Sequence, residues 1–259
     1  MYLDKKENKM LFKEKDETWF PINFQWIPIV KLNNELNKKT TKMKNKIILP
    51  VALLLVIFIS CSYEDTIYGS DELTSEFRTL ESFTKVSSEG VFEVNIVQGD
   101  TQSVEVIANN NIIHRVKTKV VNNELRLYLD NNNYMDIELQ VNITVPNIDG
   151  VKNLGTGDIS ILDVDTAADF NVYNSGTGDI TIEGTAKGIT IKNEGTGKLE
   201  GFLFTVEDCN VKIIGSGDCE VNVLNELDVA IEGSGDVYYL GTPTIEVNIT
   251  GSGKIMKAN

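Results

Sequence analysis

Apolar and polar residues alternate with a period of two along most of residues 77 to 257. Four stretches show the pattern before residue 147: VFEVNIVQGD, QSVEVIA, NELRLYL and IELQVNITVP. Successive side chains of a strand point to opposite faces, so this period predicts β-strands. Turn signals separate them at Gly99-Asp100, Asn109 to Asn111 and Asn122-Asn123. The segment NNNIIHRV predicts a short helical turn within an otherwise all-β region.

A glycine tetrapeptide divides the second half of the chain. It reads GTGD, GTGD, GTGK, GSGD, GSGD and GSGK, at spacings of 21, 19, 20, 18 and 18 residues. A period near 19 is typical of a stacked repeat. We expect its glycines to form tight corners, because glycine adopts backbone angles that strain other residues. These twelve structural-turn glycines are Gly155, Gly157, Gly176, Gly178, Gly195, Gly197, Gly215, Gly217, Gly233, Gly235, Gly251 and Gly253.

Apolar residues recur at fixed offsets from each tetrapeptide. The position six residues before the first glycine holds Phe170, Ile189, Cys209, Leu227 and Ile245. Each repeat is therefore expected to form a strand, a glycine turn, a second strand and a looser corner. Stacking such repeats in register predicts an all-β parallel β-solenoid, or β-helix, of about 18–21 residues per coil. The strands before residue 147 would cap or begin it.

Two sets of inward positions carry polar or sulfur atoms. Asn153, Asn174 and Asn193 stand two residues before the first glycine of three copies, and isoleucine takes this place in the next three. We expect the amides to form a ladder of hydrogen bonds with one another along the solenoid axis. Cys209 and Cys219 flank one turn and also face inward, so a disulfide and two free buried thiols both remain open.

The N-terminal region resembles a bacterial lipoprotein signal. From Met43 the chain reads MKNKIILPVALLLVIFISC, with an apolar run of 13 residues that is too short to span a bilayer. We expect residues 1–42 to be a non-native upstream extension and residues 43–60 to be the signal peptide. Cys61 would be lipidated, and residues 61–76 would form an acidic tether. An ordinary cleaved signal or a buried cysteine is the alternative, since Phe58 and Ile59 depart from the usual motif.

The charge balance limits the partners of the remaining chain. Residues 1 to 60 contain 11 lysines and six acidic residues, which leaves 13 basic and 32 acidic residues, a net charge near −19. This acidity disfavours nucleic acid and anionic lipid surfaces as partners. We expect membrane contact through the lipid anchor, at the outer membrane and on its periplasmic or exposed side.

A resemblance to a known family covers residues 77 to 257. The opening at Phe83 to Val86, the segment GVFEVNIVQGDTQSVEVIANNNIIHRVKTKVVNNELRLYL, a strand ending in Val145-Pro146 and the serial GSGD turns occur in this order. They resemble the family described as putative auto-transporter adhesin, head GIN domain. The resemblance implies a secreted or surface β-solenoid domain, here residues 77–259 with repeats at 150–257, and it brings no catalytic residues.

The fourth residue of each tetrapeptide forms a column that is the candidate metal site. Asp158, Asp179, Asp218 and Asp236 would stack, and unit charges ~4.8 Å apart repel by about 0.9 kcal/mol in water. Lysine at two of the six positions reduces that repulsion. Weak calcium binding is therefore a hypothesis, and no other cofactor is expected. Nucleotide binding is disfavoured, because a phosphate loop needs a following helix and each turn here precedes a strand.

A second outward column suggests a ligand face. Lys152, Tyr173, Lys192 and Lys212 would share one strand face, which suits an extracellular glycan or protein or is simply a solvated surface. The favoured function is a non-enzymatic, lipid-anchored surface module, an adhesin or ligand-binding domain. The alternatives are a polysaccharide lyase or hydrolase, with Glu200 and Glu220 as its carboxylates, and a purely structural envelope subunit. The single histidine, His114, has no recognisable catalytic partner.

Overall fold

The structure is a computed structural model that describes residues 2–4, 9–13, 19–21 and 66–259, in two compact units. The first unit, Met1–Tyr63, contains a three-stranded antiparallel sheet. Its strands are β1 (Tyr2–Asp4), β2 (Lys9–Lys13) and β3 (Trp19–Pro21). The predicted lipidation at Cys61 and the predicted signal peptide lie outside the described residues. Within the described part, no helix has the length and apolar character needed to cross a membrane.

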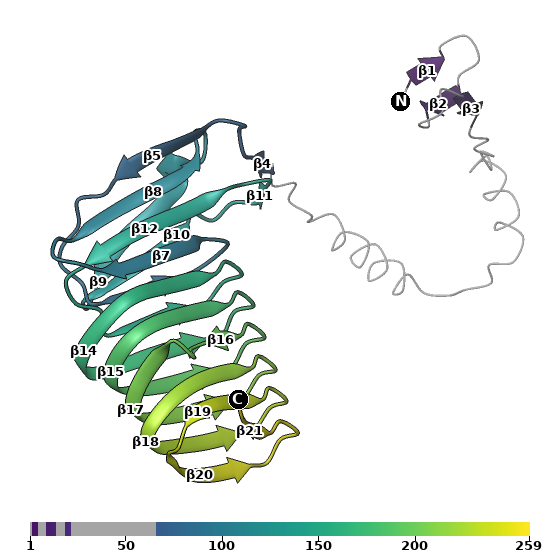
Figure 1. The fold of residues 1–259 in the computed structure, drawn as a ribbon. Coiled ribbons are helices and arrows are strands. Elements are labelled where there is room, and N and C mark those ends of the chain that lie inside the picture. Colours follow the sequence, from purple (N-terminus) through teal and green to yellow (C-terminus); the bar gives the residue numbers. More distant parts are fainter. Residues whose placement is uncertain (1, 5–8, 14–18, 22–65) are drawn as a thin grey trace, which may run out of the picture. The chain divides into compact units, whose positions relative to one another are not determined.

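The second unit, Glu64–Asn259, is nearly all β (Figure 1). Its first half contains β4 (Ile67–Tyr68), β5 (Leu73–Phe77), β6 (Lys85–Ser88), β7 (Glu93–Gln98), β8 (Ser103–Asn109), the 3₁₀ turn η3 (Ile113–Arg115), β9 (Val116–Val121), β10 (Glu124–Leu129), β11 (Tyr134–Met135) and β12 (Leu139–Val145). Its second half contains β13 (Gly150–Asn153), β14 (Ile159–Asn174), β15 (Ile180–Asn193), β16 (Leu199–Glu200), β17 (Phe204–Ile213), β18 (Cys219–Ile231), β19 (Val237–Gly241), β20 (Thr244–Ile249) and β21 (Ile255–Lys257).

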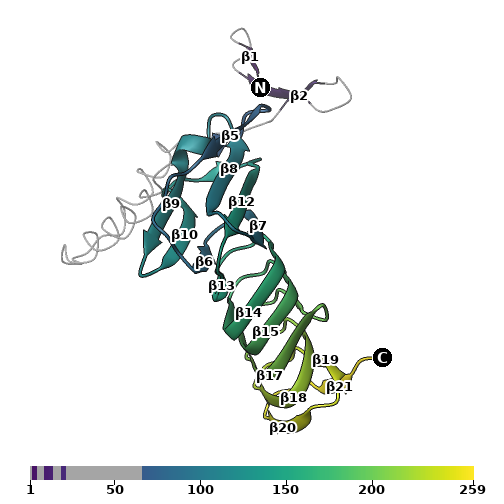
Figure 2. The same ribbon diagram turned by 60° about the vertical axis from the view of Figure 1, so that its left-hand side comes forward.

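The second half is the predicted parallel β-solenoid. Strands β13, β14, β15, β17, β18 and β20 pair in parallel down one side, and Figure 2 shows the coils stacked along one axis. Equivalent positions of successive tetrapeptide repeats stand opposite one another, as in the pair Ile159 and Ile180. The expected looser corner is a bend within one strand, because β14 continues through it with register shifts at Ile161/Val164 and Thr166/Asp169.

The solenoid begins one coil earlier than the tetrapeptide indicates. Strand β6 pairs with β13, and β7 pairs with β14, so residues 85–98 form a first coil. Its turn has Gly90 and Phe92 beneath Gly155 and Gly157 of the next coil. Residues 99–149 are inserted between this coil and the next. Together with β7 of the first coil they form a mixed sheet, in which β12 pairs parallel with β7 and antiparallel with β8.

The folded unit also includes residues assigned to the tether by the sequence prediction. Strand β4 pairs with β11, and β5 pairs with β8 in an antiparallel register. The 3₁₀ turn at Ile113–Arg115 confirms the helical turn expected in NNNIIHRV.

Apolar columns fill the core of the second unit. Large side chains such as Phe170 are fully buried, and the Phe170 and Phe204 rings pack edge to face with centroids 5.8 Å apart. Cys209 and Cys219 are both buried and free, so the disulfide alternative is not formed.

The apolar columns of the core end at the last coil, where the inward residues of β20 are partly exposed. Ile245 is 36% exposed and Val247 is 43% exposed, whereas Leu227 and Val229 directly above them are 0% and 3% exposed. The expectation that Ile245 lies in the core is therefore wrong. The reason is that no further coil packs against β20 in the described part of the chain.

Candidate functional site

The tetrapeptide glycines are required by close stacking rather than by backbone angle. In the described residues, glycines with a positive φ occur at Gly90, Gly184 and Gly241, and none belongs to a tetrapeptide. A Cβ added at any of the twelve would lie 1.9–2.2 Å from a backbone carbonyl oxygen of the preceding coil. The predicted turns are present, but the expectation that they need glycine for conformational freedom is wrong.

The buried asparagines hold these turns in place. The Asn153 amide donates to the carbonyl of Gly157 at 2.8 Å and to that of Gly178 in the next coil at 3.2 Å. Its Oδ1 accepts from the backbone N–H of Gly155 at 3.1 Å. Asn174 and Asn193 repeat this arrangement. The expected ladder of amides bonded to one another is therefore wrong, because the amides bond to glycine backbone atoms instead.

The aspartate column also joins neighbouring coils. Asp158 Oδ1 accepts from the backbone N–H of Asp179 at 2.8 Å, and Asp179 Oδ1 accepts from that of Lys198 at 2.7 Å. Asp218 and Asp236 accept in the same way at 2.7 and 2.8 Å. In the described part of the chain, no group of three or more His, Cys, Asp or Glu side chains is arranged to hold a metal ion. These four carboxylates stabilise coil stacking, and the described residues offer calcium no assembled set of ligands.

The four residues of the predicted ligand face form a column on the outer surface. Lys152, Tyr173, Lys192 and Lys212 are consecutive partners in the parallel registers of β13, β14, β15 and β17. Lys192 Nζ lies 5.5 Å from the centre of the Tyr173 ring. The column continues past Lys152 through Ser87 of β6 to Arg126 of β10, so it extends onto the first coil and the inserted sheet.

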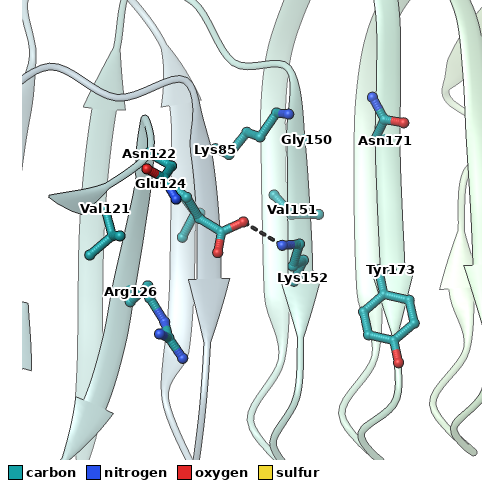
Figure 3. Close-up of a pocket in the computed structure, with 11 residues that line it drawn as sticks. Lys85, Val121, Asn122, Glu124, Arg126, Gly150, Val151, Lys152, Asn171 and Tyr173 are labelled. Atoms are coloured by element: carbon teal, nitrogen blue, oxygen red, sulfur yellow. Dashed lines mark ion pairs between the residues drawn. The ribbon is translucent and has the colours of Figure 1, made fainter. Parts of the chain in front are cut away.

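A groove of about 500 Å³ lies where this column reaches the inserted sheet. Gly150 lines this groove and lacks a side chain, so the surface is hollow between the longer side chains beside it. Figure 3 shows Glu124 reaching across β6 toward Lys152, with Arg126 on one side and Tyr173 on the other. The groove is lined by Lys85, Val86, Val121, Asn122, Glu124, Arg126, Gly150, Val151, Lys152, Asn171 and Tyr173.

Most cations of the column are already paired. Lys152 Nζ lies 2.6 Å from Glu124 Oε2, and Arg126 Nε donates to Glu89 at 3.1 Å. The hydrogen bond and the charge of Glu89 raise the pKa of Arg126 above its ordinary value. By contrast, the structure gives the exposed Lys85 ammonium neither a hydrogen bond nor an ion pair within the described residues. Lys85 is therefore the cation of the groove that is available to a ligand.

The solenoid end of the column is held in a fixed arrangement. Lys192 Nζ lies 2.7 Å from Glu194, and the Tyr173 hydroxyl donates to the same carboxylate. The hydrogen bond from Lys192, and to a lesser extent that from Tyr173, lowers the pKa of Glu194. The hydrogen bond to Glu194 raises the pKa of Lys192. Lys212 pairs with Glu232 at 2.8 Å. The Tyr173 ring is thus oriented before any ligand arrives.

Sequence patterns predicted two of the groove residues and missed the others. Lys152 and Tyr173 belong to the repeats, so periodicity identifies them. Lys85 and Arg126 lie outside the repeats, and only the pairing of β6 with β13 and β10 brings them beside Lys152. The first-coil turn at Gly90 was the one available signal, since it follows β6 as the tetrapeptides follow their strands.

Glu200 and Glu220 share a lysine. Lys198 Nζ lies 2.6 Å from Glu220 and 3.4 Å from Glu200. The Glu220 contact is the main cause that raises the pKa of Lys198, so this ammonium stays protonated at neutral pH and cannot act as a base. His114 contributes its backbone carbonyl, which accepts from Lys117 Nζ. Neither arrangement supplies a group prepared for proton transfer.

The stacked coils, the inserted mixed sheet and the outer groove define this protein as a β-solenoid domain with a candidate binding face. A family model described as putative auto-transporter adhesin, head GIN domain, matches residues 82–243, and the chain belongs to this family. A search of curated proteins found no match.

Solved structures from Bacteroides and Parabacteroides species are similar to this chain. A putative adhesin from Bacteroides fragilis NCTC 9343 is 24% identical, with a TM-score of 0.64 over 74% of this chain and 100% of that one. A putative adhesin from Parabacteroides merdae ATCC 43184 is 16% identical, with a TM-score of 0.45 over 75% of this chain and all of that one. A putative lipid binding protein from Parabacteroides distasonis ATCC 8503 is 19% identical, with a TM-score of 0.46 over the same shares. The first of these likenesses supports the solenoid architecture.

Proposed function

We propose that this protein is a non-enzymatic, lipid-anchored module of the bacterial envelope that binds an acidic glycan in the groove. The family and the Bacteroides fragilis neighbour carry adhesin in their descriptions, which supports a cell-surface or envelope location. The observation that carries the proposal is the unpaired Lys85 ammonium in a hollow that also presents Asn122, Asn171 and the oriented Tyr173 ring.

Each of these groups suits a carboxylated sugar. An ammonium forms charge-assisted hydrogen bonds with a carboxylate, and side-chain amides donate to and accept from sugar hydroxyls. The apolar part of Tyr173 can cover a sugar ring while its hydroxyl stays bonded to Glu194. One free cation among neutralised pairs favours a ligand with few charges over a polyanion.

The groove is tested by measuring binding to uronic-acid and neutral oligosaccharides and to extracellular-matrix proteins. Lys85→Gln should weaken binding of the acidic oligosaccharides about tenfold, since a hydrogen bond to a charged group contributes roughly 1.5–3 kcal/mol. Tyr173→Ala should weaken binding of both kinds of sugar. Lys187→Gln removes an exposed lysine outside the groove and should bind like the unaltered protein.

Several outcomes would contradict the proposal. Equal affinity of Lys85→Gln and the unaltered protein would exclude the groove, and capture of matrix proteins alone would exclude a glycan ligand. Loss of binding in EDTA would support the calcium hypothesis at Asp158 and its column instead. Release of glycan fragments that Glu200→Gln or Glu220→Gln abolishes would show an enzyme.

The anchor is tested separately by incorporation of labelled palmitate in a bacterial host with lipoprotein processing. The cysteine that follows the apolar segment supports lipidation, so Cys61→Ser should abolish labelling while the protein is still made. Equal labelling of the Cys61→Ser variant would contradict the proposed lipidation and would leave the proposed glycan binding in the groove unaffected.

A further inference from the structure

The C-terminal end of the solenoid is an uncovered cross-section of its core. Three inward residues of β20, Ile245, Val247 and Ile249, are 36%, 43% and 40% exposed. Their counterparts one coil earlier, Leu227, Val229 and Ile231, are 0–3% exposed. The same columns that are dry throughout the solenoid therefore meet solvent at this end.

The backbone at this end is also open to pairing. Strand β20 pairs with β18 on one side only, and β21 pairs with β19 on one side only, among the strands that the structure describes. An edge strand with unpaired N–H and C=O groups is a template for another strand, and proteins usually block it with lysine or proline. The sequence TIEVNI of β20 contains neither, whereas Pro243 directly precedes β20 and β21 carries Lys257.

The opposite end of the same sheet is built differently. Its terminal strand β9 carries Lys117 and Lys119 and, of the strands described, pairs with β10 alone, in an antiparallel register. Lysines on an edge strand are a common protection against pairing with another strand. Strand β20 lacks this protection, and its apolar residues are symmetric about Val247, which suits an identical strand as its partner.

We propose that two copies of this protein associate through their C-terminal coils, with β20 pairing antiparallel to β20 about a two-fold axis at Val247. In this register Val247 faces its own counterpart, Ile245 faces Ile249 and Glu246 faces Asn248. Directly opposite residues of an antiparallel pair lie on the same face, so the apolar residues meet over the core. A register shifted by one residue would place Ile245 against Asn248 and is excluded by the same rule.

Charge also fits this register. The one charged side chain of β20, Glu246, lies opposite an amide rather than another carboxylate. A two-fold interface uses the same patch on both copies, which suits a strand whose apolar residues are symmetric about its centre. Closed pairing at one end leaves the groove at Lys85 available on both copies.

The mass of the full chain is measured against concentration by light scattering, for the unaltered protein and for Val247→Lys. Two lysines facing each other on the axis should raise the dissociation constant about tenfold or more. Leu224→Lys is the matched control, because Leu224 is an apolar residue, 53% exposed, that lies in β18 before the segment Glu226–Ile231 that pairs with β20. It should dimerise like the unaltered protein, and far-ultraviolet circular dichroism checks that each variant is folded.

Disulfide formation tests the register itself, in a chain that carries Cys61→Ser. The native thiols Cys209 and Cys219 are buried, so they leave a clean background. Val247→Cys should form a dimer on mild oxidation, because the two thiols face each other across the axis. Asn248→Cys faces Glu246 in the same dimer and should form no disulfide cross-link.

Three results would overturn the proposal. They are a monomer at every concentration reached, equal cross-linking of the Val247→Cys and Asn248→Cys variants, and open-ended polymers in place of dimers.

Discussion

At the scale of the residue, burial decides what the two thiols can do. Cys219 is fully buried, and burial raises its pKa from the ordinary 9.0 to about 12. Burial raises the pKa of Cys209 as well. A thiol held neutral is a poor nucleophile and metal ligand, so both cysteines act as small apolar side chains of the core.

These thiols make stability depend on alkaline pH. The folded-state pKa of Cys219 is raised, so its contribution is complete below pH 9 and is lost as pH rises toward 12. The free energy of unfolding should fall by about 1.4 kcal/mol per pH unit in this window for one thiol. Urea unfolding between about pH 8 and 11 should show a flatter pH dependence of the free energy of unfolding for Cys219→Ala than for the unaltered protein. Identical slopes in both proteins would contradict the assignment.

At the scale of the element, each glycine turn is a contact between coils. The Asn153 amide bonds to Gly157 in its own turn and to Gly178 in the next, so one side chain fixes both their geometry and their spacing. Where isoleucine replaces asparagine, at Ile213 and Ile231, the corner is apolar and the side chain is still buried. Coils with asparagine and coils with isoleucine at this position stack equally closely, so glycine is needed in all six tetrapeptides.

Gly178→Ala should destabilise the protein for this reason. Its Cβ would lie 2.1 Å from the carbonyl oxygen of Gly157, and a backbone atom can yield only if the coils move apart. We expect a loss of about 1–3 kcal/mol in the free energy of unfolding, the usual cost of overpacking. Gly99→Ala is the control, because its nearest atom is the side-chain methyl of Thr144 at 2.9 Å. Equal losses in thermal or urea unfolding would show that stacking does not select glycine.

At the scale of the whole molecule, the negative charge opposes folding. The chain carries a net charge of −14, which repels itself in the compact state. The ion pairs along the ligand column act in the other direction, but exposed pairs contribute little. We therefore expect the repulsion from the net negative charge to outweigh the attraction of these ion pairs.

Added salt should raise the melting temperature. The screening length falls from about 30 Å at 0.01 M to about 8 Å at 0.15 M, which weakens long-range repulsion more than contacts. We expect a rise of about 2–4 °C in NaCl, equivalent to about 1 kcal/mol in a protein of this size. KCl should act equally if screening is the cause. A falling melting temperature would show that the ion pairs outweigh the net charge.

The solenoid was predictable because its signals are local and repeated. The tetrapeptide marks each turn, and alternation assigns each side chain to the core or the surface, so registers such as Ile159 opposite Ile180 follow by alignment. The first coil was not predictable, because Phe92 stands where later coils have glycine and an insertion separates it from the next coil.

The sequence by itself determined the coil period, the inward columns and the outward order of Lys152, Tyr173, Lys192 and Lys212. Only the tertiary structure decided the rest. Strand pairing places Lys85 and Arg126 beside that column. The asparagine amides bond to glycine carbonyls, and Val247 is exposed at the last coil. The reason is that periodicity describes positions within a repeat, whereas these features depend on what lies beside the first coil and beyond the last.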